Sequence, residues 1–403
     1  MRLLFTTYAE RAHLLPMVPL AWACLAAGHE VRMATTPSLL EAVERTGLPA
    51  VAVGRDIDVD ARLARGDLAP LRADPSESQE DAESRVLGNM ARLQFDHCDA
   101  MADDLTRFAR AWRPDVVVYD PVTYAGPVTA RERGVPAVCQ LYGMARLLRL
   151  EMRGLTSEEP LPGYRDLFER RGLETMLHPA AWIDPRPPGM RWSEEDAVLP
   201  AAAVKNRLPM RYIPYNGPGT SPDPQPGAPD RPRVCVTWGT TQQRKMGVSV
   251  IDLFREVVTA VAGLDVEVLV TVGAARKELV QRLGALPENV RPVGWHPLNL
   301  LLSGCSAIVH TGGTGTVMTA AACAVPQLGI TRIREGVYNA AQLETTGAGL
   351  CLDEEGLDPA DVRERVAALL GDERYGSAAR RLRDEIEAQP APAELVPALA
   401  ELC

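Results

Sequence analysis

The chain has 403 residues, of which 46% are hydrophobic, and its formal net charge at neutral pH is −10. This length is sufficient for two domains with full cores. No basic cluster is present, which argues against nucleic-acid binding, because such proteins group Lys and Arg against the phosphates. No apolar run reaches the length of a membrane span, and the first seven residues are too short for a signal peptide. We therefore expect a cytoplasmic protein without a membrane span.

The eight cysteines include no CxxC pair and lie mostly in apolar stretches. This distribution predicts buried thiols in a reducing compartment, and it does not resemble a disulfide framework or a metal site.

In the first half of the chain, apolar runs of strand length alternate with stretches of helical periodicity. A strand, a helix and a second strand of these lengths form a βαβ unit, so a parallel sheet with right-handed crossovers is expected. Residues 56–83 and 142–210 have no comparable pattern. The expected strands are residues 3–7, 30–35, 50–53, 115–119 and 136–141, and the expected helices are residues 14–27, 37–46, 84–112 and a segment that ends at Gly134.

A stretch rich in Pro and Gly follows, and a second α/β series begins after it. The helical tail from about Pro359 is interrupted at residues 390–392. The fold class is therefore α/β, with two doubly wound Rossmann-like domains and a cleft between their strand ends, where ligands of such sheets bind. The second set of expected strands is residues 233–238, 266–272, 289–293, 307–309 and 327–330. The expected domains are residues 1–210, a linker at 211–232, a second domain at 233–385, and a tail at 386–403 that could pack back on the first domain.

The stretch from His310 to Thr316, His-Thr-Gly-Gly-Thr-Gly-Thr, lies between an expected strand and an expected helix. A strand, a glycine turn and a helix form a phosphate-binding geometry, because glycines admit an anion close to the backbone and the first helical N–H groups point at it. Thr314, Thr316 and the His310 ring can add donors. A tight turn without a ligand is the alternative, since short glycine motifs also match by chance.

His13 is expected in a loop, residues 8–13, after the first strand, and Asp120 follows a later strand of the same sheet. If these strands are neighbours, both side chains lie at the carboxyl edge of the sheet. A histidine oriented by an aspartate is the arrangement of a general base that deprotonates a hydroxyl. A surface histidine, and a turn residue before Pro121, are the alternatives.

Longer motifs carry a resemblance to a known family. Residues 13–22, His-Leu-Leu-Pro-Met-Val-Pro-Leu-Ala-Trp, together with residues 26–31, resemble the N-terminal signature of family 1 inverting glycosyltransferases of the two-domain GT-B fold. Residues 211–217 resemble the domain junction of one subgroup, the actinobacterial enzymes that attach dTDP-deoxysugars to macrolide, anthracycline and related polyketide antibiotics. Residues 309–316 are similar to the donor-diphosphate motif of the family.

The resemblance implies a role for individual residues. His13 would be the general base and Asp120 its partner carboxylate. His310 and the backbone of Gly312–Gly315 would hold the diphosphate, and Trp295 would contact the nucleobase, with a core aromatic as the alternative. The donor-binding residues implied in this way are Gly239, Thr240, Trp295, His310, Gly312, Gly313, Thr314, Gly315, Thr316 and Glu335.

One position departs from the family pattern. Many relatives carry Asp-Gln before the pair that is Asn339-Ala340 here, and this chain has Glu335-Gly336. Loss of the amide removes a partner for a sugar hydroxyl, so a donor without that hydroxyl would lose less. We therefore form the hypothesis of a deoxygenated donor sugar, with drift of a loop as the alternative.

Taken as a whole, the resemblance implies a metal-independent glycosyltransferase that needs no cofactor. It would transfer a sugar from a dTDP-deoxyhexose, with inversion, to an apolar natural-product aglycone bound by the first domain and its segments 56–100 and 142–200. A nucleotide-sugar epimerase of the same fold and a catalytically silent scaffold that binds nucleotide sugars are the rival functions. A helper protein related to cytochromes P450, which some relatives need, and a homodimer stay open as partners, as do the sugar, the aglycone and the type of glycosidic bond.

Overall fold

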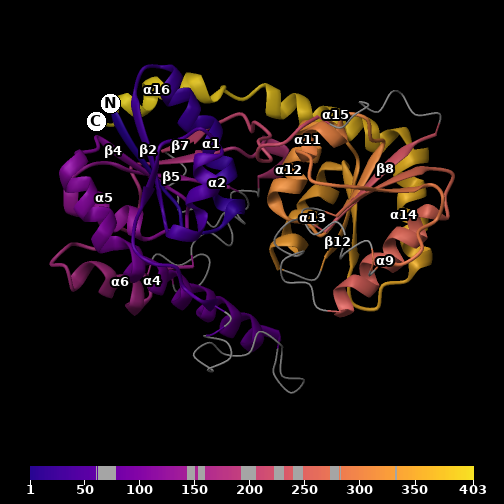
Figure 1. Ribbon diagram of the computed structural model, residues 1–403, viewed down its shortest axis with the longest axis horizontal. Helices are drawn as coiled ribbons and strands as arrows, with labels where there is room; N and C mark the ends of the chain where they lie inside the picture. Colours follow the sequence, from indigo (N-terminus) through magenta and orange to yellow (C-terminus); the bar gives the residue numbers. More distant parts are fainter. Residues whose placement is uncertain are drawn as a thin grey trace. The chain divides into compact units, whose positions relative to one another are not determined.

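A computed structural model of the chain is shown in Figure 1. It describes residues 1–59, 61, 79–142, 150–152, 159–191, 206–221, 231–238, 248–272, 281, 283–331 and 334–403. The chain divides into two compact units. Unit 1 comprises Met1–Asp184, Ser193–Met210 and Pro390–Cys403, and unit 2 comprises Pro185–Trp192 and Arg211–Gln389.

The described residues of unit 1 form a parallel sheet of seven strands in the order β3-β2-β1-β4-β5-β6-β7. The chain runs outward from β1 in one direction and then from β4 in the other, so the topological switch point lies between β1 and β4. Ligands of open α/β sheets bind outside the carboxyl ends of the strands at such a point. The strands are β1 Arg2–Thr6, β2 Glu30–Thr35, β3 Ala50–Ala52, β4 Val116–Tyr119, β5 Ala137–Gln140, β6 Ala181–Asp184 and β7 Arg207–Pro209.

The helices and strands of unit 1 alternate as expected, with two differences. Helix α1 begins at Arg11, so His13 lies in its first turn and the prediction of a loop through residue 13 was wrong. Because the helix begins at Arg11, Pro16 and Pro19 lie inside it and not in its first turn, so each removes one intrahelical hydrogen bond. The second difference is that β6 and β7 lie in the segment that appeared irregular. The helices are α1 Arg11–Ala26, η1 Pro37–Leu39, α2 Leu40–Glu44, α4 Gln79–Trp112, α5 Ala125–Arg133, α6 Pro162–Glu169 and α16 Pro392–Ala400.

Helix α16 packs against α1, and Figure 1 shows the two helices side by side at the edge of unit 1. Leu395, Val396 and Leu399 are the apolar side chains that α16 buries. Burying side chains of this size stabilises a fold by about 1.5–3 kcal/mol each. The last helix in the chain therefore supports the helix that carries His13.

The described residues of unit 2 form a second parallel sheet, of six strands, in the order β10-β9-β8-β11-β12-β13. Its switch point lies between β8 and β11. Strand β13 was not among the expected strands. The elements are β8 Arg233–Thr237, α9 Val248–Ala262, β9 Glu267–Thr271, β10 Val290–Val293, α11 Leu298–Leu302, β11 Ala307–His310, α12 Thr314–Ala322, β12 Gln327–Thr331, α13 Arg334–Thr346, β13 Gly349–Asp353, α14 Pro359–Gly371 and α15 Glu373–Glu387.

Two segments belong to unit 2 although composition placed them elsewhere. The short helix η3, Pro188–Met190, falls within the expected first domain but packs on α13 and α15. Its Gly189 amide donates to the Glu385 carboxylate at 2.6 Å, and the Gln342 amide donates to the Gly189 carbonyl at 3.0 Å. Residues 211–221, expected to be linker, also contact unit 2.

The thiols agree only partly with the prediction that they are buried. Cys24, Cys98, Cys139 and Cys235 are buried, whereas Cys403 is exposed. None of the helices in the described part of the chain combines the length and apolar character needed to cross a bilayer.

Candidate active site

His13 and Asp120 meet at the switch point of unit 1. Strands β1 and β4 are adjacent, with Thr6 opposite Tyr119, so the residues after both strands emerge at the same edge. The His13 Nδ1 atom lies 3.0 Å from Asp120 Oδ1, and the two residues are 7% and 0% exposed. The structure thus brings together the two side chains expected to be neighbours.

The Asp120 carboxylate is fully surrounded by donors. In addition to His13, the Val122 amide donates to Oδ1 at 3.2 Å and the Thr123 hydroxyl donates to Oδ2. A carboxylate accepts hydrogen bonds and does not donate them, so the His13 proton that faces it lies on Nδ1. The Nε2 atom is therefore the basic nitrogen of this ring.

Two aromatic rings lie against the His13 ring, and one of them reaches Nε2. The Tyr8 hydroxyl lies 3.3 Å from His13 Nε2. The Tyr142 ring centroid lies 4.1 Å from that of His13, and the Tyr8 centroid lies 4.9 Å from it. Sequence reasoning missed Tyr8, Tyr142 and Thr123. The signal that could have found them is their position directly after β1, β5 and β4, at the same edge of the sheet.

The glycine turn occupies the equivalent point of unit 2, after β11 and before α12. Gly312 adopts φ +76°, a left-handed conformation that favours glycine. A Cβ added there would lie 2.5 Å from the Gly336 Cα atom, so the turn is also closely packed. The backbone amides of Thr314 and Gly315 lie in the first turn of α12, where an N–H has no intrahelical acceptor and points toward any ligand.

The His310 ring is hydrogen-bonded to the backbone of this turn. Its Nε2 atom lies 2.9 Å from Gln327 Oε1, and its Nδ1 atom accepts the Gly312 amide at 2.9 Å. Gln327 Oε1 can only accept, so the ring proton is on Nε2 and both ring nitrogens are engaged. His310 is 1% exposed, and burial lowers the pKa of its imidazole from 6.5 to about 4, although the hydrogen bond to Gln327 acts in the opposite direction. We expected this ring to donate a hydrogen bond to a phosphate. In the structure its only N–H donates to Gln327 instead.

Asn339, noted only as a landmark in the sequence, holds the other side of the turn. Its Nδ2 atom donates to the Gly312 carbonyl at 2.8 Å and to Thr314 Oγ1 at 3.0 Å. Both polar backbone groups of Gly312 therefore have side-chain partners, and the orientation of the neighbouring amides is fixed.

Trp295, expected to contact a nucleobase, is half-buried. Its Nε1 atom donates to the Pro218 carbonyl at 3.0 Å, and the indole lies 3.4 Å from the position of a Cβ on Gly217. His296, beside it, contacts the Thr220 carbonyl through Nδ1 at 3.0 Å. The indole therefore packs against residues 217–220, which composition assigned to the linker.

The same segment also binds the helix that begins at the glycine turn. The Thr319 hydroxyl, on α12, donates to the Gly315 carbonyl at 2.6 Å. It also contacts the Tyr212 hydroxyl at 3.2 Å and accepts the Asn216 amide at 3.0 Å. The motif at residues 211–217, which resembles the domain junction of the subgroup, thus has a local structural function. It binds α12 through hydrogen bonds from Tyr212 and Asn216.

Three expected donor-binding residues cannot be placed. Gly239 and Thr240 lie outside the described residues, as does the side chain of Glu335, whose backbone belongs to α13. The last described residues before Gly239 follow β8, which is adjacent to β11. In the part of the chain that is described, no group of three or more His, Cys, Asp or Glu side chains is arranged to hold a metal ion.

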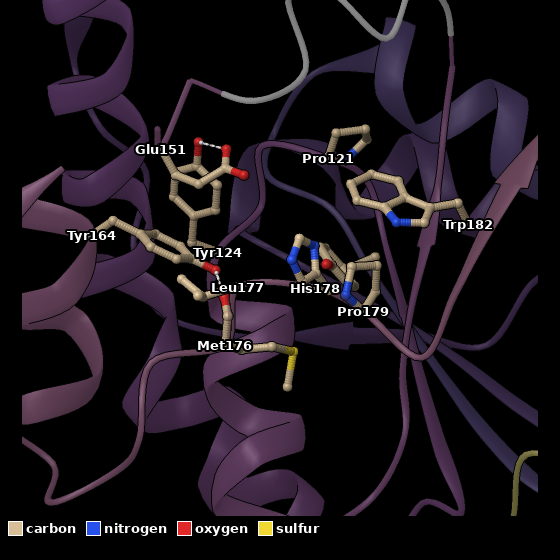
Figure 2. Close-up of a pocket in the computed structure, with 10 residues that line it drawn as sticks. Pro121, Tyr124, Glu151, Tyr164, Met176, Leu177, His178, Pro179 and Trp182 are labelled. Atoms are coloured by element: carbon tan, nitrogen blue, oxygen red, sulfur yellow. Dashed lines mark hydrogen bonds between the residues drawn. The ribbon is translucent and has the colours of Figure 1, made fainter. Parts of the chain in front are cut away.

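A small pocket lies in unit 1 (Figure 2), and four of its ten lining residues are Tyr or Trp. Tyr119 and Pro121, which flank Asp120 in the chain, line it, together with residues from the segment that appeared irregular. At one end the Tyr124 hydroxyl donates to the Glu151 carboxylate at 3.2 Å. At the other end, the buried Nε1–H of Trp182 has no hydrogen-bond partner among the residues that the structure describes. The pocket therefore has room for about one water molecule, next to an unused donor.

Two parallel α/β sheets of this kind, each with a cluster of polar groups at its switch point, define a protein of two Rossmann-like domains. Comparison with protein families specifies the class. The family described as erythromycin biosynthesis protein CIII-like matches with its N-terminal domain at residues 22–239 and with its C-terminal domain at residues 255–402. The chain belongs to this family, and it is a glycosyltransferase of the GT-B fold.

Individual relatives are similar along their whole length. The aclacinomycin-T 2-deoxy-L-fucose transferase of Streptomyces galilaeus is 37% identical, with 100% of this chain and 96% of the relative covered. The 10-deoxymethynolide desosaminyltransferase of Streptomyces venezuelae is 35% identical, with 100% and 97% covered. Among solved structures, the glycosyltransferase VinC in complex with dTDP is 33% identical, with a TM-score of 0.81 and 100% and 99% of the two chains covered.

Proposed function

We propose that this glycosyltransferase moves a deoxysugar from a dTDP-activated donor to an apolar natural-product aglycone, with inversion, and that His13 is the general base oriented by Asp120. The observation that carries the proposal is the buried His13–Asp120 pair at the switch point of unit 1. Two relatives are named as transferases of 2-deoxy-L-fucose and desosamine, which supports the class of donor.

In this mechanism the acceptor hydroxyl gives its proton to His13 Nε2, and the oxygen keeps the electron pair of the broken O–H bond. That oxygen attacks the anomeric carbon on the face opposite the leaving diphosphate, so the configuration inverts. Asp120 remains ionised and stabilises the imidazolium that forms through its Nδ1–H. General base catalysis of this kind contributes about 10²–10⁴-fold to a rate.

The leaving diphosphate is assigned to the glycine turn of unit 2. The amides of Thr314 and Gly315 supply hydrogen-bond donors, and preorganised donors stabilise a developing charge without reorganising. His310 and Asn339 act behind the turn by fixing Gly312, so the ring of His310 is a support of the site. Gly239 and Thr240, after the adjacent strand, are proposed to add phosphate contacts, and Trp295 to contact the nucleobase. The complex of the related VinC with dTDP supports this assignment.

The acceptor is assigned to unit 1, which carries His13. The pocket of Figure 2 has room for about one water molecule and not for a polyketide skeleton, but it admits a single oxygen atom of the aglycone, to which the buried Trp182 Nε1–H can donate. A related solved structure, the spinosyn rhamnosyltransferase SpnG complexed with spinosyn aglycone, supports an aglycone acceptor; it is 29% identical, with a TM-score of 0.80 and 99% and 100% of the two chains covered. Trp182→Phe should raise the KM for the acceptor and leave the dissociation constant for dTDP unchanged; an unchanged KM would remove Trp182 from the acceptor site.

The hypothesis of a deoxygenated donor sugar, which was drawn from the Glu335-Gly336 pair, can be tested with two donors. If the missing amide reflects a deoxygenated sugar, the purified chain transfers from a dTDP-2,6-dideoxysugar with a higher kcat/KM than from dTDP-glucose. A clear preference for dTDP-glucose would end that hypothesis. The same assay also tests whether a P450-related helper is required, because the purified chain is then the only protein present.

The decisive test of the base is His13→Ala. We expect turnover to fall by about 10²–10⁴-fold while the dissociation constant for dTDP, measured by calorimetry, stays within about twofold. The matched control is His29→Ala, which removes another histidine of unit 1, one whose Nδ1 atom contacts the N-terminal amine. Equal turnover in the His13 and His29 variants would remove His13 from the mechanism.

A further inference from the structure

The two sides of the His13 ring are connected to each other through Thr123. Asp120 faces Nδ1 and the Tyr8 hydroxyl faces Nε2. The Tyr8 amide donates to Thr123 Oγ1 at 3.1 Å, and the Thr123 hydroxyl donates to Asp120 Oδ2. One hydroxyl therefore fixes the backbone of one histidine partner and the side chain of the other.

The direction of each hydrogen bond follows from its neighbour. Because Asp120 accepts from Nδ1–H, Nε2 carries the lone pair, and the Tyr8 hydroxyl donates to it. A donated O–H stabilises the neutral ring, and it also occupies the position that the proton of an acceptor hydroxyl must reach. Tyr8 thus lies where the reaction begins, at a nitrogen that the acceptor has to take over.

We propose that Tyr8 is a positioning residue for the base. Its hydroxyl donates a hydrogen bond to His13 Nε2 until the acceptor hydroxyl takes that place. Thr123, which binds both the Tyr8 backbone and Asp120, fixes the distance between the two partners of the ring. This inference rests on the proposed function of His13. In the reaction the acceptor O–H bond breaks and an N–H bond forms at Nε2, while Tyr8 keeps its own proton. Tyr8 therefore has to give up its hydrogen bond to Nε2 but takes no part in proton transfer.

The surroundings of Tyr8 keep its ring in place. Its centroid lies 4.7 Å from that of His97, on α4, and its edge packs on His13. Among the residues that the structure describes, the titratable groups in contact with His13 or Tyr8 are Asp120 after β4, Tyr142 after β5, and His97 on α4. A phenylalanine at position 8 would keep these ring contacts and remove only the hydroxyl, which makes the proposal testable.

The first test follows the His13 ring itself. In the full chain with nitrogen-labelled histidines, NMR spectra of Tyr8→Phe should show the His13 Nε2 resonance displaced from its wild-type position, since the hydrogen bond to that nitrogen is lost. The His29 resonances are an internal control in the same spectra and should keep their positions. An unchanged His13 Nε2 resonance overturns the proposal, and this result does not depend on whether His13 is the base.

The second test is kinetic. In Tyr8→Phe the acid limb of the kcat/KM profile should move to higher pH, because the hydroxyl that stabilises the neutral ring is gone, and the plateau rate should rise, because the acceptor no longer competes with a hydroxyl. If Tyr8 only fills space, the limb stays where it is, or the rate falls equally at every pH, and either outcome overturns the proposal.

The role of Thr123 is tested by a matched pair of variants. Thr123→Ser keeps the hydroxyl and should stay within about threefold of the wild-type kcat. Thr123→Val keeps the shape and removes a hydrogen bond to a charged group, which corresponds to a loss of about 10–150-fold. Equal kcat values for the two variants would overturn the link through Thr123, and circular dichroism spectra confirm that both proteins are folded.

Discussion

Replacing Gly312 by alanine should destabilise unit 2 strongly. At φ +76° an L-residue costs about 1–2 kcal/mol relative to glycine. The added Cβ would lie 2.5 Å from the Cα and 2.8 Å from the carbonyl oxygen of Gly336, which are backbone atoms that cannot rotate away. Overpacking of this kind costs about 1–3 kcal/mol. The two effects together lower the free energy of unfolding by about 2–5 kcal/mol.

The matched control is Gly315→Ala, three residues along the same turn. Among the described residues outside its own helix and its chain neighbours, a Cβ there meets no atom within 4 Å, and alanine favours a helix over glycine by about 0.5–1 kcal/mol. Chemical denaturation of both variants should therefore show a large loss for Gly312→Ala and none for Gly315→Ala. Calorimetry with dTDP should show weaker binding to Gly315→Ala, because the new methyl group enters the space in front of the turn. A Gly312→Ala protein within about 0.5 kcal/mol of the wild type would refute the reasoning.

Two further predictions concern buried polar groups of unit 2. Thr319→Val leaves the Tyr212 hydroxyl and the Asn216 amide without their common partner, so denaturant titration should show a loss of about 1–3 kcal/mol that Thr319→Ser does not share. The depressed pKa of His310, about 4 against 6.5, means that the unfolded chain binds an extra proton between these values, so stability is complete above about pH 6.5 and falls by up to about 3 kcal/mol as the pH is lowered toward 4. His310→Asn should flatten this part of the pH–stability curve, and a curve of unchanged slope would show that another group titrates.

The repeated alternation of strand and helix predicted five of the seven strands of the described sheet in unit 1 and five of the six in unit 2, because buried parallel strands are continuous apolar runs. Strands β6 and β7 were missed, since they are short and lie next to stretches without periodicity. The start of α1 was misplaced because Glu10, its N-cap residue, makes no side-chain cap hydrogen bond. Without a cap signal, the sequence does not show that the helix begins before His13.

The candidate site was predictable where a residue is fixed by a strand end. His13 and Asp120 meet because β1 and β4 are neighbours, and that follows from the edge rule. The position of His310 was also predictable, but its orientation was not. Its ring proton is directed to Gln327, which lies 17 residues away on the next strand. The contacts of Tyr8 and Thr123 depend in the same way on loop geometry that no spacing in the sequence encodes.

The contact between α16 and α1 has a consequence for biosynthesis. Domains generally fold as units, the first to emerge from the ribosome folding first. Here unit 1 lacks one of its helices until all of unit 2 has been translated, so the surface of α1 against which α16 packs stays open during that interval. A nascent chain halted before residue 392 should therefore hold an unfinished unit 1, and chaperones would have a binding target there for most of the translation time.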